Sequence, residues 1–168
     1  LMTDHNVPTA KYRAFSKDEI SEAKKFMGEC TFPLVFKADG LAAGKGVMIA
    51  NNISECEEIM KDFSDGNSLK EAGYNFIIEE FLDGEEGSVF AISDGEDFVL
   101  LPFAQDHKKI SEGEKGKNTG GMGAVAPIGK FMSDEMLGKI ERNVVVPVLN
   151  AMKVIGAEFK GCLYCGLM

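Results

Sequence analysis

The sequence feature that most constrains the fold is a glycine-rich loop between two short apolar segments. Residues 33–38, Pro-Leu-Val-Phe-Lys-Ala, are typical of a strand that ends at Asp39-Gly40, and residues 47–50, Val-Met-Ile-Ala, are typical of a second strand. A strand, a short loop and another strand predict an antiparallel hairpin. The rest of the chain lacks the alternating β-α-β spacing of a doubly wound sheet, so α+β is the predicted class.

Capping patterns and apolar periodicity predict further elements. Ser16-Lys-Asp-Glu19 is a capping box that predicts a helix to about Glu29, and Ser54-Glu-Cys-Glu57 predicts a second helix through about Phe63. We expect strands at 76–82, 88–92, 98–101 and 161–168, a hairpin turn at Asp94-Gly95, loops at 64–73 and 105–130, and a helix that starts at Ser133 and is bent or divided at Pro147.

Charge and composition exclude several function classes. The net charge of −9 argues against nucleic-acid binding, which needs a basic face, but a few local cations suffice for a small phosphorylated ligand. No apolar run approaches the length of a membrane span. The cysteines show no second ligand pair beside Cys162-Leu-Tyr-Cys165, whose apolar surroundings predict core thiols on a buried strand rather than a zinc or redox site. Reduced cysteines without a secretory signal indicate the cytoplasm.

The glycine-rich loop itself is suited to phosphate binding. Lys37 ends the preceding strand, and Gly40, Gly44 and Gly46 surround small residues and Lys45, so that backbone N–H groups can converge on phosphate oxygens. The loop is not a Walker motif: it is one residue too short, it has glycine where Ser or Thr should hold magnesium, and a strand follows instead of a helix. A flexible surface hairpin stays open as an alternative.

Two other blocks combine polar residues with turns. Glu79-Glu-Phe-Leu-Asp-Gly-Glu-Glu86 is either a solvated strand edge or a nucleotide hinge, in which the backbone reads adenine and a later carboxylate binds ribose hydroxyls. Gln105-Asp-His-Lys-Lys109 leads to Asn118-Thr-Gly-Gly-Met-Gly-Ala124. Asp, His and Lys beside a glycine loop with side-chain donors favour an anionic substrate over a structural role.

These blocks together resemble the phosphoribosylamine–glycine ligase family, whose ATP-grasp loop is similar to Lys37–Val47. The blocks at 79–86, 105–108 and 118–124 follow in the family's order, and His5–Ala10 and Leu163–Met168 are also similar. The resemblance covers almost the whole chain. It implies a partial ATP-grasp fold, with residues 1–82 as the small nucleotide-binding lobe and 83–168 as part of the large lobe.

The resemblance implies that ATP activates the carboxylate of glycine as an acyl phosphate, which the amine of 5-phosphoribosylamine attacks to give glycinamide ribonucleotide in purine biosynthesis. It implies catalytic roles for Lys37, Asp106, His107 and Lys108. Nucleotide contacts are implied for Lys37, Asp39, Gly40, Gly44, Lys45, Gly46, Glu79, Glu80, Leu82 and Glu86. Substrate contacts are implied for Asp106, His107, Lys108, Asn118, Thr119, Gly120, Gly121, Met122 and Gly123.

The family also has parts that this sequence does not resemble. These are N- and C-terminal domains of the same polypeptide and a strand with the Glu and Asn that hold Mg²⁺ or Mn²⁺, so we expect no metal ligands here and no independent activity. Another ATP-grasp carboxylate–amine ligase and a non-catalytic nucleotide-binding domain are the alternatives. The blocks at 105–108 and 118–124 argue against the first, and the retained lysine, carboxylates and glycines argue against the second.

Overall fold

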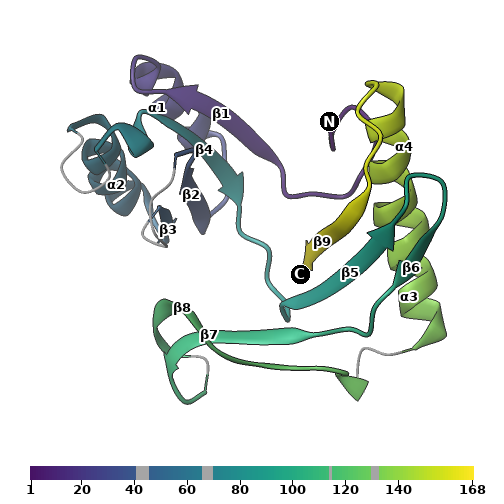
Figure 1. The fold of residues 1–168 in the computed structure, drawn as a ribbon. Helices are drawn as coiled ribbons and strands as arrows, with labels where there is room; N and C mark the ends of the chain where they lie inside the picture. The colour runs from purple at the N-terminus through teal and green to yellow at the C-terminus, as the bar shows by residue number, and fades with distance from the viewer. Residues whose placement is uncertain (41–45, 66–69, 114, 130–132) are drawn as a thin grey trace. The chain divides into compact units, whose positions relative to one another are not determined.

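Helices and antiparallel strands form two compact units in the computed structural model, which describes residues 1–40, 46–65, 70–113, 115–129 and 133–168 (Figure 1). One unit is Ala10–Leu82, and the other combines Leu1–Thr9 with Asp83–Met168. The units divide after Leu82, where the sequence places the lobe boundary, but the structure groups Leu1–Thr9 with the second unit rather than the first. None of the helices that the described residues form is long and apolar enough to cross a membrane.

The unit Ala10–Leu82 is a four-stranded antiparallel sheet with two helices. Its strands, in spatial order, are β1 (Tyr12–Ser16), β4 (Asn75–Glu80), β2 (Leu34–Ala38) and β3 (Val47–Ala50). Its helices are α1 (Ile20–Gly28), α2 (Ile53–Asp65) and the short 3-10 helix η1 (Lys70–Gly73). The strands at 34–38 and 47–50 pair as the predicted antiparallel hairpin.

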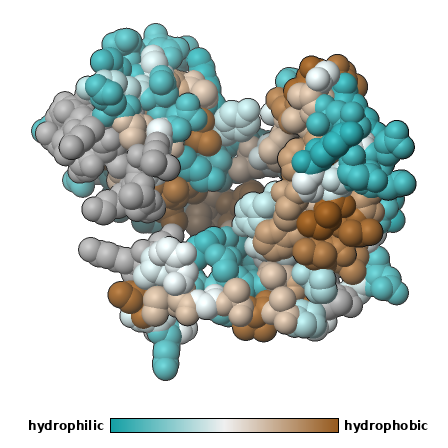
Figure 2. Space-filling model, in the orientation of Figure 1, coloured by the Kyte–Doolittle hydropathy of each residue, from teal (hydrophilic) through white to brown (hydrophobic). Residues whose placement is uncertain are grey.

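Strand alternation gives this sheet one apolar face that the helices cover and one face that they leave uncovered. Phe36 and Phe76 are fully buried and pack against Phe63 of α2, with ring centroids 6.4 and 5.2 Å from it. Successive side chains of a strand point to opposite faces, so Lys37, next to Phe36, projects from the face that the helices do not cover. The surface over α1 is largely hydrophilic (Figure 2), while Ala23 and Met27 of this helix lie in the core.

Both predicted helices of this unit begin at a residue other than the one their capping boxes indicate. Ser16 belongs to β1, a strand that the sequence analysis missed, and the Glu19 carboxylate accepts hydrogen bonds of 2.9 Å from its N–H and hydroxyl groups. The helix α1 therefore starts only at Ile20. For α2 the capping pair lies two residues earlier than predicted: Asn52 Oδ1 accepts from the N–H of Glu55 at 3.0 Å.

The second unit packs a three-stranded sheet against a helical layer. The sheet has the order β6 (Phe98–Leu100), β5 (Gly87–Ser93), β9 (Gly161–Leu167). The helical layer comprises α3 (Asp134–Ile140), the π-helical turn η3 (Glu141–Val145) and α4 (Val146–Val154). A separate two-stranded ribbon consists of β7 (Gln105–Ser111) and β8 (Lys115–Val125). Val89, Phe103, Val145 and Leu149 are among the buried core residues.

The predicted hairpin and helix of this unit are confirmed. The Asp94 carboxylate accepts from the N–H groups of Glu96 and Asp97 and closes the turn between β5 and β6. Ser133 caps α3 by accepting from the N–H of Met136 at 3.1 Å. Pro147 lacks an N–H group and is the second residue of α4, which follows η3, so the helical run is divided next to the proline, as the sequence predicts.

The prediction of an irregular loop at 105–130 was wrong, and the predicted loop at 64–73 is helical at its described ends, while residues 66–69 lie outside the described residues. Most of the first segment is the antiparallel ribbon β7–β8, and α2 and η1 occupy both ends of the second. The strand β8 contains four glycines within Lys115–Val125, a composition that disfavours a strand in isolation. Pairing with β7 gives the backbone N–H and C=O groups of β8 their hydrogen-bond partners. These bonds hold the strand where glycine offers no side chain to pack.

The cysteines of β9 differ in burial although both were predicted to lie in the core. The strand itself is confirmed, and Cys165 is buried, but Cys162 is exposed because it is an odd number of residues away, on the opposite face. All four cysteines are free thiols. Burial raises the pKa of Cys56 to about 11 and also raises the pKa of Cys165.

We expect a neutral thiol reagent to distinguish these cysteines in the native protein. Cys162 should react with iodoacetamide at pH 8, whereas Cys56 and Cys165 should react only after denaturation, because they are buried and their thiolates form at higher pH. Peptide mapping by mass spectrometry before and after addition of urea measures this. Equal labelling of Cys162 and Cys56 in the native protein would contradict the burial pattern of β9 and α2.

Candidate functional site

The first group of predicted site residues lies on the face of the four-stranded sheet that the helices leave uncovered. Lys37 on β2 forms an ion pair with Glu79 on the neighbouring β4, and the Glu79 side chain is only 14% exposed. The register places Val35 opposite Glu79 and Lys37 opposite Ile77, so the paired side chains are diagonal neighbours on one face. A lysine in this position is charged, held by a partner and 41% exposed, which leaves it able to meet a phosphate.

The end of β4 is fixed by hydrogen bonds to the chain before β1. The N–H of Lys11 donates to the Glu80 carboxylate at 2.9 Å, and the N–H of Glu80 donates to the carbonyl of Lys11 at 2.9 Å. These two bonds hold the backbone that leads to the exposed residues Phe81 and Leu82. A hinge that reads a base edge with backbone groups requires such a fixed strand end.

Asp39 directly follows β2 in the same unit, and its N–H donates to the carbonyl of Asn75 at 2.8 Å. It lines a hollow of about 340 Å³ together with Asn75, Ser16 and Glu19, among other residues. The lining contains two carboxylates and no basic side chain, so it does not favour a phosphate. Gly40 packs closely on η1, because a Cβ at Gly40 would lie 2.6 Å from the Cα of Ala72. Gly44 and Lys45 lie outside the described residues, and Gly46 accepts from the N–H of Ala38 through its carbonyl at 2.8 Å.

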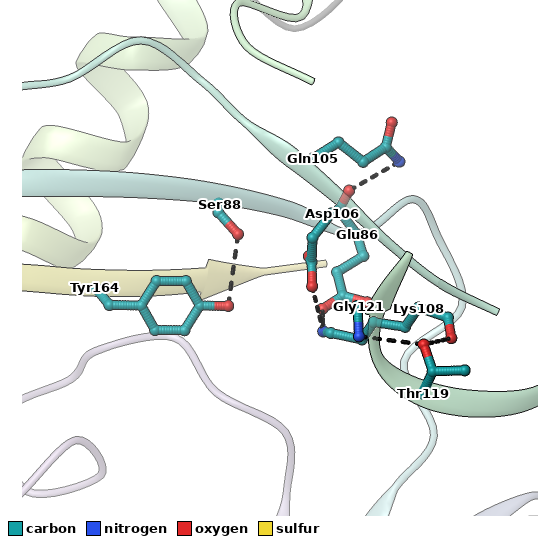
Figure 3. A network of polar contacts seen from close by, with 8 residues as sticks. All are labelled: Glu86, Ser88, Gln105, Asp106, Lys108, Thr119, Gly121 and Tyr164. Carbon is teal, nitrogen blue, oxygen red and sulfur yellow. Dashed lines mark hydrogen bonds and ion pairs between the residues drawn. The ribbon is translucent and has the colours of Figure 1, made fainter. Parts of the chain in front are cut away.

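The second group lies in the other unit, around Glu86 (Figure 3). The Lys108 ammonium donates to the Glu86 carboxylate and also lies 3.3 Å from Asp106 Oδ2. The hydrogen bond to Glu86 raises the pKa of Lys108 in spite of the desolvation that opposes it. Glu86 immediately precedes β5, and Lys108 and Asp106 are on β7, so strands far apart in sequence bring these charges together.

Two further residues fix the position of Glu86. Gln105 donates from Nε2 to the carbonyl of Glu86 at 3.1 Å. A Cβ at Gly87 would lie 2.1 Å from the Phe103 ring, so only glycine allows this ring to pack beneath the start of β5. Sequence reasoning placed Gln105 in the right block without giving it a role. The feature of the sequence that could have indicated a role for Gln105 is its position directly before Asp106.

Asp106 retains an unused acceptor. Its Oδ1 atom is shielded from solvent and accepts no hydrogen bond from the described residues, while its Oδ2 atom faces Lys108. A buried carboxylate oxygen without a donor is costly in a folded protein. A ligand with an N–H or ammonium group would satisfy it.

The glycine block of β8 presents an open backbone surface beside these charges. A Cβ added at Gly120 or Gly123 would meet nothing within 4 Å, and neither position requires a left-handed backbone. Packing and backbone geometry therefore leave the missing side chains unexplained, whereas close approach of a ligand to the backbone explains them. Met122 is 59% exposed in the same block, and His107 stands opposite Gly123 in the ribbon. Asn118 is opposite Lys109, and its side chain lies outside what the structure describes.

The structure thus brings the predicted residues together in two separate groups, one in each unit. Lys37, Glu79, Glu80 and Leu82 belong to the first, and Glu86, the Asp106–Lys108 segment and the 118–123 block belong to the second. Asp39 is not joined to Lys37 by any interaction that the described residues show. Within the described part of the chain, no three His, Cys, Asp or Glu residues cluster in a way that could hold a metal ion.

Comparison with known proteins shows to which family this chain belongs. The family model described as "Phosphoribosylglycinamide synthetase, ATP-grasp (A) domain" matches residues 1–168. The chain belongs to this family. The phosphoribosylamine–glycine ligase of Leptospira interrogans, serovar copenhageni, is 42% identical over 168 residues, which are 100% of this chain and 39% of that protein. The chain therefore spans about two fifths of the length of such relatives.

Solved structures confirm the fold. The crystal structure of phosphoribosylamine–glycine ligase from Thermotoga maritima matches with a TM-score of 0.87 and 34% identity, over 99% of this chain and 41% of that one. The VanG D-Ala:D-Ser ligase of Enterococcus faecalis matches with a TM-score of 0.70 and 16% identity, over 98% and 45%, and shows the fold alone. The predicted α+β class and the partial ATP-grasp fold are confirmed.

Proposed function

We propose that this phosphoribosylglycinamide synthetase domain binds ATP for the ligation of glycine to 5-phosphoribosylamine. The observation that carries the proposal is the pair of ion-paired lysines, each beside the group that the family resemblance assigns to ATP or to a substrate: Lys37 with Glu79, and Lys108 with Glu86. Both lysines are partly exposed. Each carboxylate is paired with a lysine ammonium, and a bound ligand can take the place of that ammonium. The family match over residues 1–168 supports the same assignment.

The two groups have different tasks in this proposal. Lys37 contacts the ATP phosphates, the segment from Glu80 to Leu82 reads adenine with its backbone, and Glu86 binds the ribose hydroxyls. Lys108 then neutralises charge on the glycine carboxylate or on the phosphoribosyl group. Phosphoryl transfer to a carboxylate needs mainly positioning and neutralisation of negative charge, which lysines and backbone N–H groups supply.

The Asp106 and glycine-block surfaces are assigned to the substrates. The unsatisfied Asp106 Oδ1 suits an amine or ammonium group, and the open backbone at Gly120 and Gly123 suits an anion that approaches N–H groups closely. His107 adjoins both surfaces through its place opposite Gly123. The reaction is written as transfer of the γ-phosphoryl group of ATP to the glycine carboxylate, followed by attack of the amine of phosphoribosylamine with loss of phosphate.

We further propose that the chain acts as part of a longer cytoplasmic polypeptide, because its relatives are more than twice its length and its four cysteines are free. In the family, Mg²⁺ or Mn²⁺ screens the phosphate charge during transfer, and we assign its ligands to the parts of the relatives that the chain does not match. The described residues offer no cluster of His, Cys, Asp or Glu side chains that could hold the metal ion.

Calorimetric titration with ATP and a coupled ADP-release assay test these proposals. The 168-residue chain should bind ATP weakly and form no product, whereas the full-length protein should release ADP only with both glycine and phosphoribosylamine. Product formation by the chain alone would refute the assignment to a longer polypeptide. Turnover by the full-length protein with a different amine acceptor would refute the substrate assignment, and ATP binding without any turnover would favour a non-catalytic nucleotide-binding role.

We expect Gly120→Ala to impair substrate use without destabilising the fold. The added Cβ has open space in the ligand-free protein, so the free energy of unfolding should change by less than about 1 kcal/mol. In the complex it would occupy space that the substrate needs, and the KM for glycine or phosphoribosylamine should rise about tenfold, as for a loss of roughly 1.4 kcal/mol. Steady-state kinetics of the full-length protein measures this.

The matched control is Gly28→Ala at the end of α1. A Cβ at Gly28 also meets nothing within 4 Å, and the helix to which this glycine belongs contains no proposed site residue. It should leave all three KM values unchanged. Equal KM values in the two variants would show that the glycine block is only a structural strand.

A further inference from the structure

The strand β8 contains a large bulge opposite Lys108 of β7. Regular pairing runs from Gln105 opposite Val125 to His107 opposite Gly123, and it resumes at Lys109 opposite Asn118. Lys108 alone therefore faces the four residues 119–122 of β8. A bulge leaves backbone groups outside the ladder and redirects the side chain next to it, so its geometry determines where Lys108 points.

The Thr119 hydroxyl closes this bulge from both sides. Its Oγ1 donates to the carbonyl of Lys108 at 2.9 Å and accepts from the N–H of Gly121 at 3.1 Å. Gly121 has a φ of +132°, which side-chain-bearing residues rarely adopt, so the sequence Thr-Gly-Gly can make this turn. A hydroxyl has one proton to donate, and here the Lys108 carbonyl receives it.

This use of the proton changes the role expected for Thr119. An anionic substrate needs a donor, and the Thr119 side chain has none left in this arrangement. The Thr119 side chain instead holds the backbone of Lys108, whose ammonium pairs with Glu86 and Asp106. Figure 3 shows this chain of contacts running from Gly121 through Thr119 and Lys108 to Glu86.

We propose that Thr119 is a positioning residue, whose hydroxyl fixes the bulge and thereby aims the Lys108 ammonium at Glu86. The inference rests on the proposed function for its kinetic consequences, because that function gives Glu86 to the ribose and Lys108 to the substrates. The opposite side of the pair is held independently by Gln105, which donates to the carbonyl of Glu86 at 3.1 Å. Thr119 and Gln105 thus fix the two partners from different strands.

The first test is the titration of Lys108 in the ligand-free full-length protein. NMR of isotopically labelled lysine side chains, with the Lys108 signal assigned through Lys108→Arg, follows the ammonium directly. Thr119→Val keeps the side-chain shape but removes the hydroxyl, and it should lower the pKa of Lys108 because the bond to Glu86 weakens. Thr119→Ser keeps the hydroxyl and should preserve the pKa. Thr119→Ala gives a second hydroxyl-free variant, and an unchanged Lys108 pKa in both hydroxyl-free variants would overturn the proposal.

The second test is a double-mutant cycle on ligase kinetics. Thr119→Val should lower kcat/KM about tenfold, equivalent to roughly 1.4 kcal/mol, and Thr119→Ser should restore most of the loss. In a Lys108→Met background Thr119→Val should have no further effect, since Thr119 acts through Lys108. Additive losses would overturn the positioning role. If the protein shows no ligase activity at all, the proposed function fails, while the Lys108 titration still decides the role of Thr119.

Discussion

Lys37→Met is expected to weaken ATP binding by about 100-fold or more in the full-length protein, as for the loss of one partner of a charge pair with phosphate. Methionine keeps the apolar stem of the side chain but removes the ammonium, which projects from the uncovered face of the sheet and pairs with Glu79 in the ligand-free protein. Calorimetric titration with ATP measures the affinity. An unchanged Kd would refute the assignment of Lys37 to the ATP phosphates.

Two further variants distinguish phosphate binding by Lys37 from the neutralisation of Glu79 by the same lysine. Glu79→Gln removes the carboxylate that neutralises Lys37, so the lysine is freer to meet the phosphates, and ATP affinity should stay equal or increase a few-fold. Lys24→Met is the control for loss of one exposed lysine, because Lys24 and Glu57 form a surface pair between two helices with both side chains more than half exposed. The control should leave the Kd for ATP unchanged. A large loss of ATP affinity in Lys37→Met without any loss in Glu79→Gln is the result that a purely structural ion pair does not produce.

The hairpin and the blocks of charged residues could be predicted from the sequence because each depends on local chemistry. The strands at 34–38 and 47–50 are short apolar runs with glycine between them, and the hairpin turn at Asp94 uses a side chain that bonds its own neighbours. The capping residue Ser133 was found for the same reason. Interactions within a few residues leave a pattern that can be read from the chain.

The ribbon β7–β8 could not be predicted in the same way, because its strands have no local preference for the extended state. Four glycines in β8 and a run of polar residues in β7 resemble a loop, and only pairing across the ribbon makes them strands. The strand β1 was missed because its Ser16 and Glu19 carry the signature of a helix start. Tertiary pairing here overrides the local signal.

For the candidate site, the sequence indicated the types of residue involved but not their interaction partners. The family resemblance predicted functional roles for Lys37, Glu86 and Lys108, but it did not indicate that Glu79 would neutralise Lys37 or that Glu86 would pair with Lys108. Those partners are set by strand pairing, in one case between β2 and β4 and in the other between the start of β5 and the part of β7 that faces the bulge. Register depends on the whole sheet, so it is not visible in a single segment.

Phe63→Ala is expected to produce the reverse of the Lys37→Met result: a large loss of stability with little change in ATP affinity. Phe63 is fully buried and contacts the rings of Phe36 and Phe76 beneath the sheet. Removing a buried phenyl ring costs about 3–5 kcal/mol, a large part of the roughly 5–15 kcal/mol that stabilises an ordinary domain. Amide hydrogen exchange of β4 in increasing urea reports the unit that contains Phe63 rather than the whole polypeptide.

The affinity of the folded protein should survive this loss, because the cavity forms on the helix-covered face and Lys37 projects from the other face of β2. We expect a Kd for ATP within about threefold of the original under conditions where the unit stays folded, since a threefold change is only about 0.65 kcal/mol. Phe81→Ala is the stability control: this phenylalanine is 39% exposed, so its removal should destabilise the unit much less. If Phe63→Ala weakened ATP binding as strongly as Lys37→Met while β4 kept its protection, the apolar core and the phosphate-binding face would be coupled, and the separation of roles between Phe36 and Lys37 along β2 would be wrong.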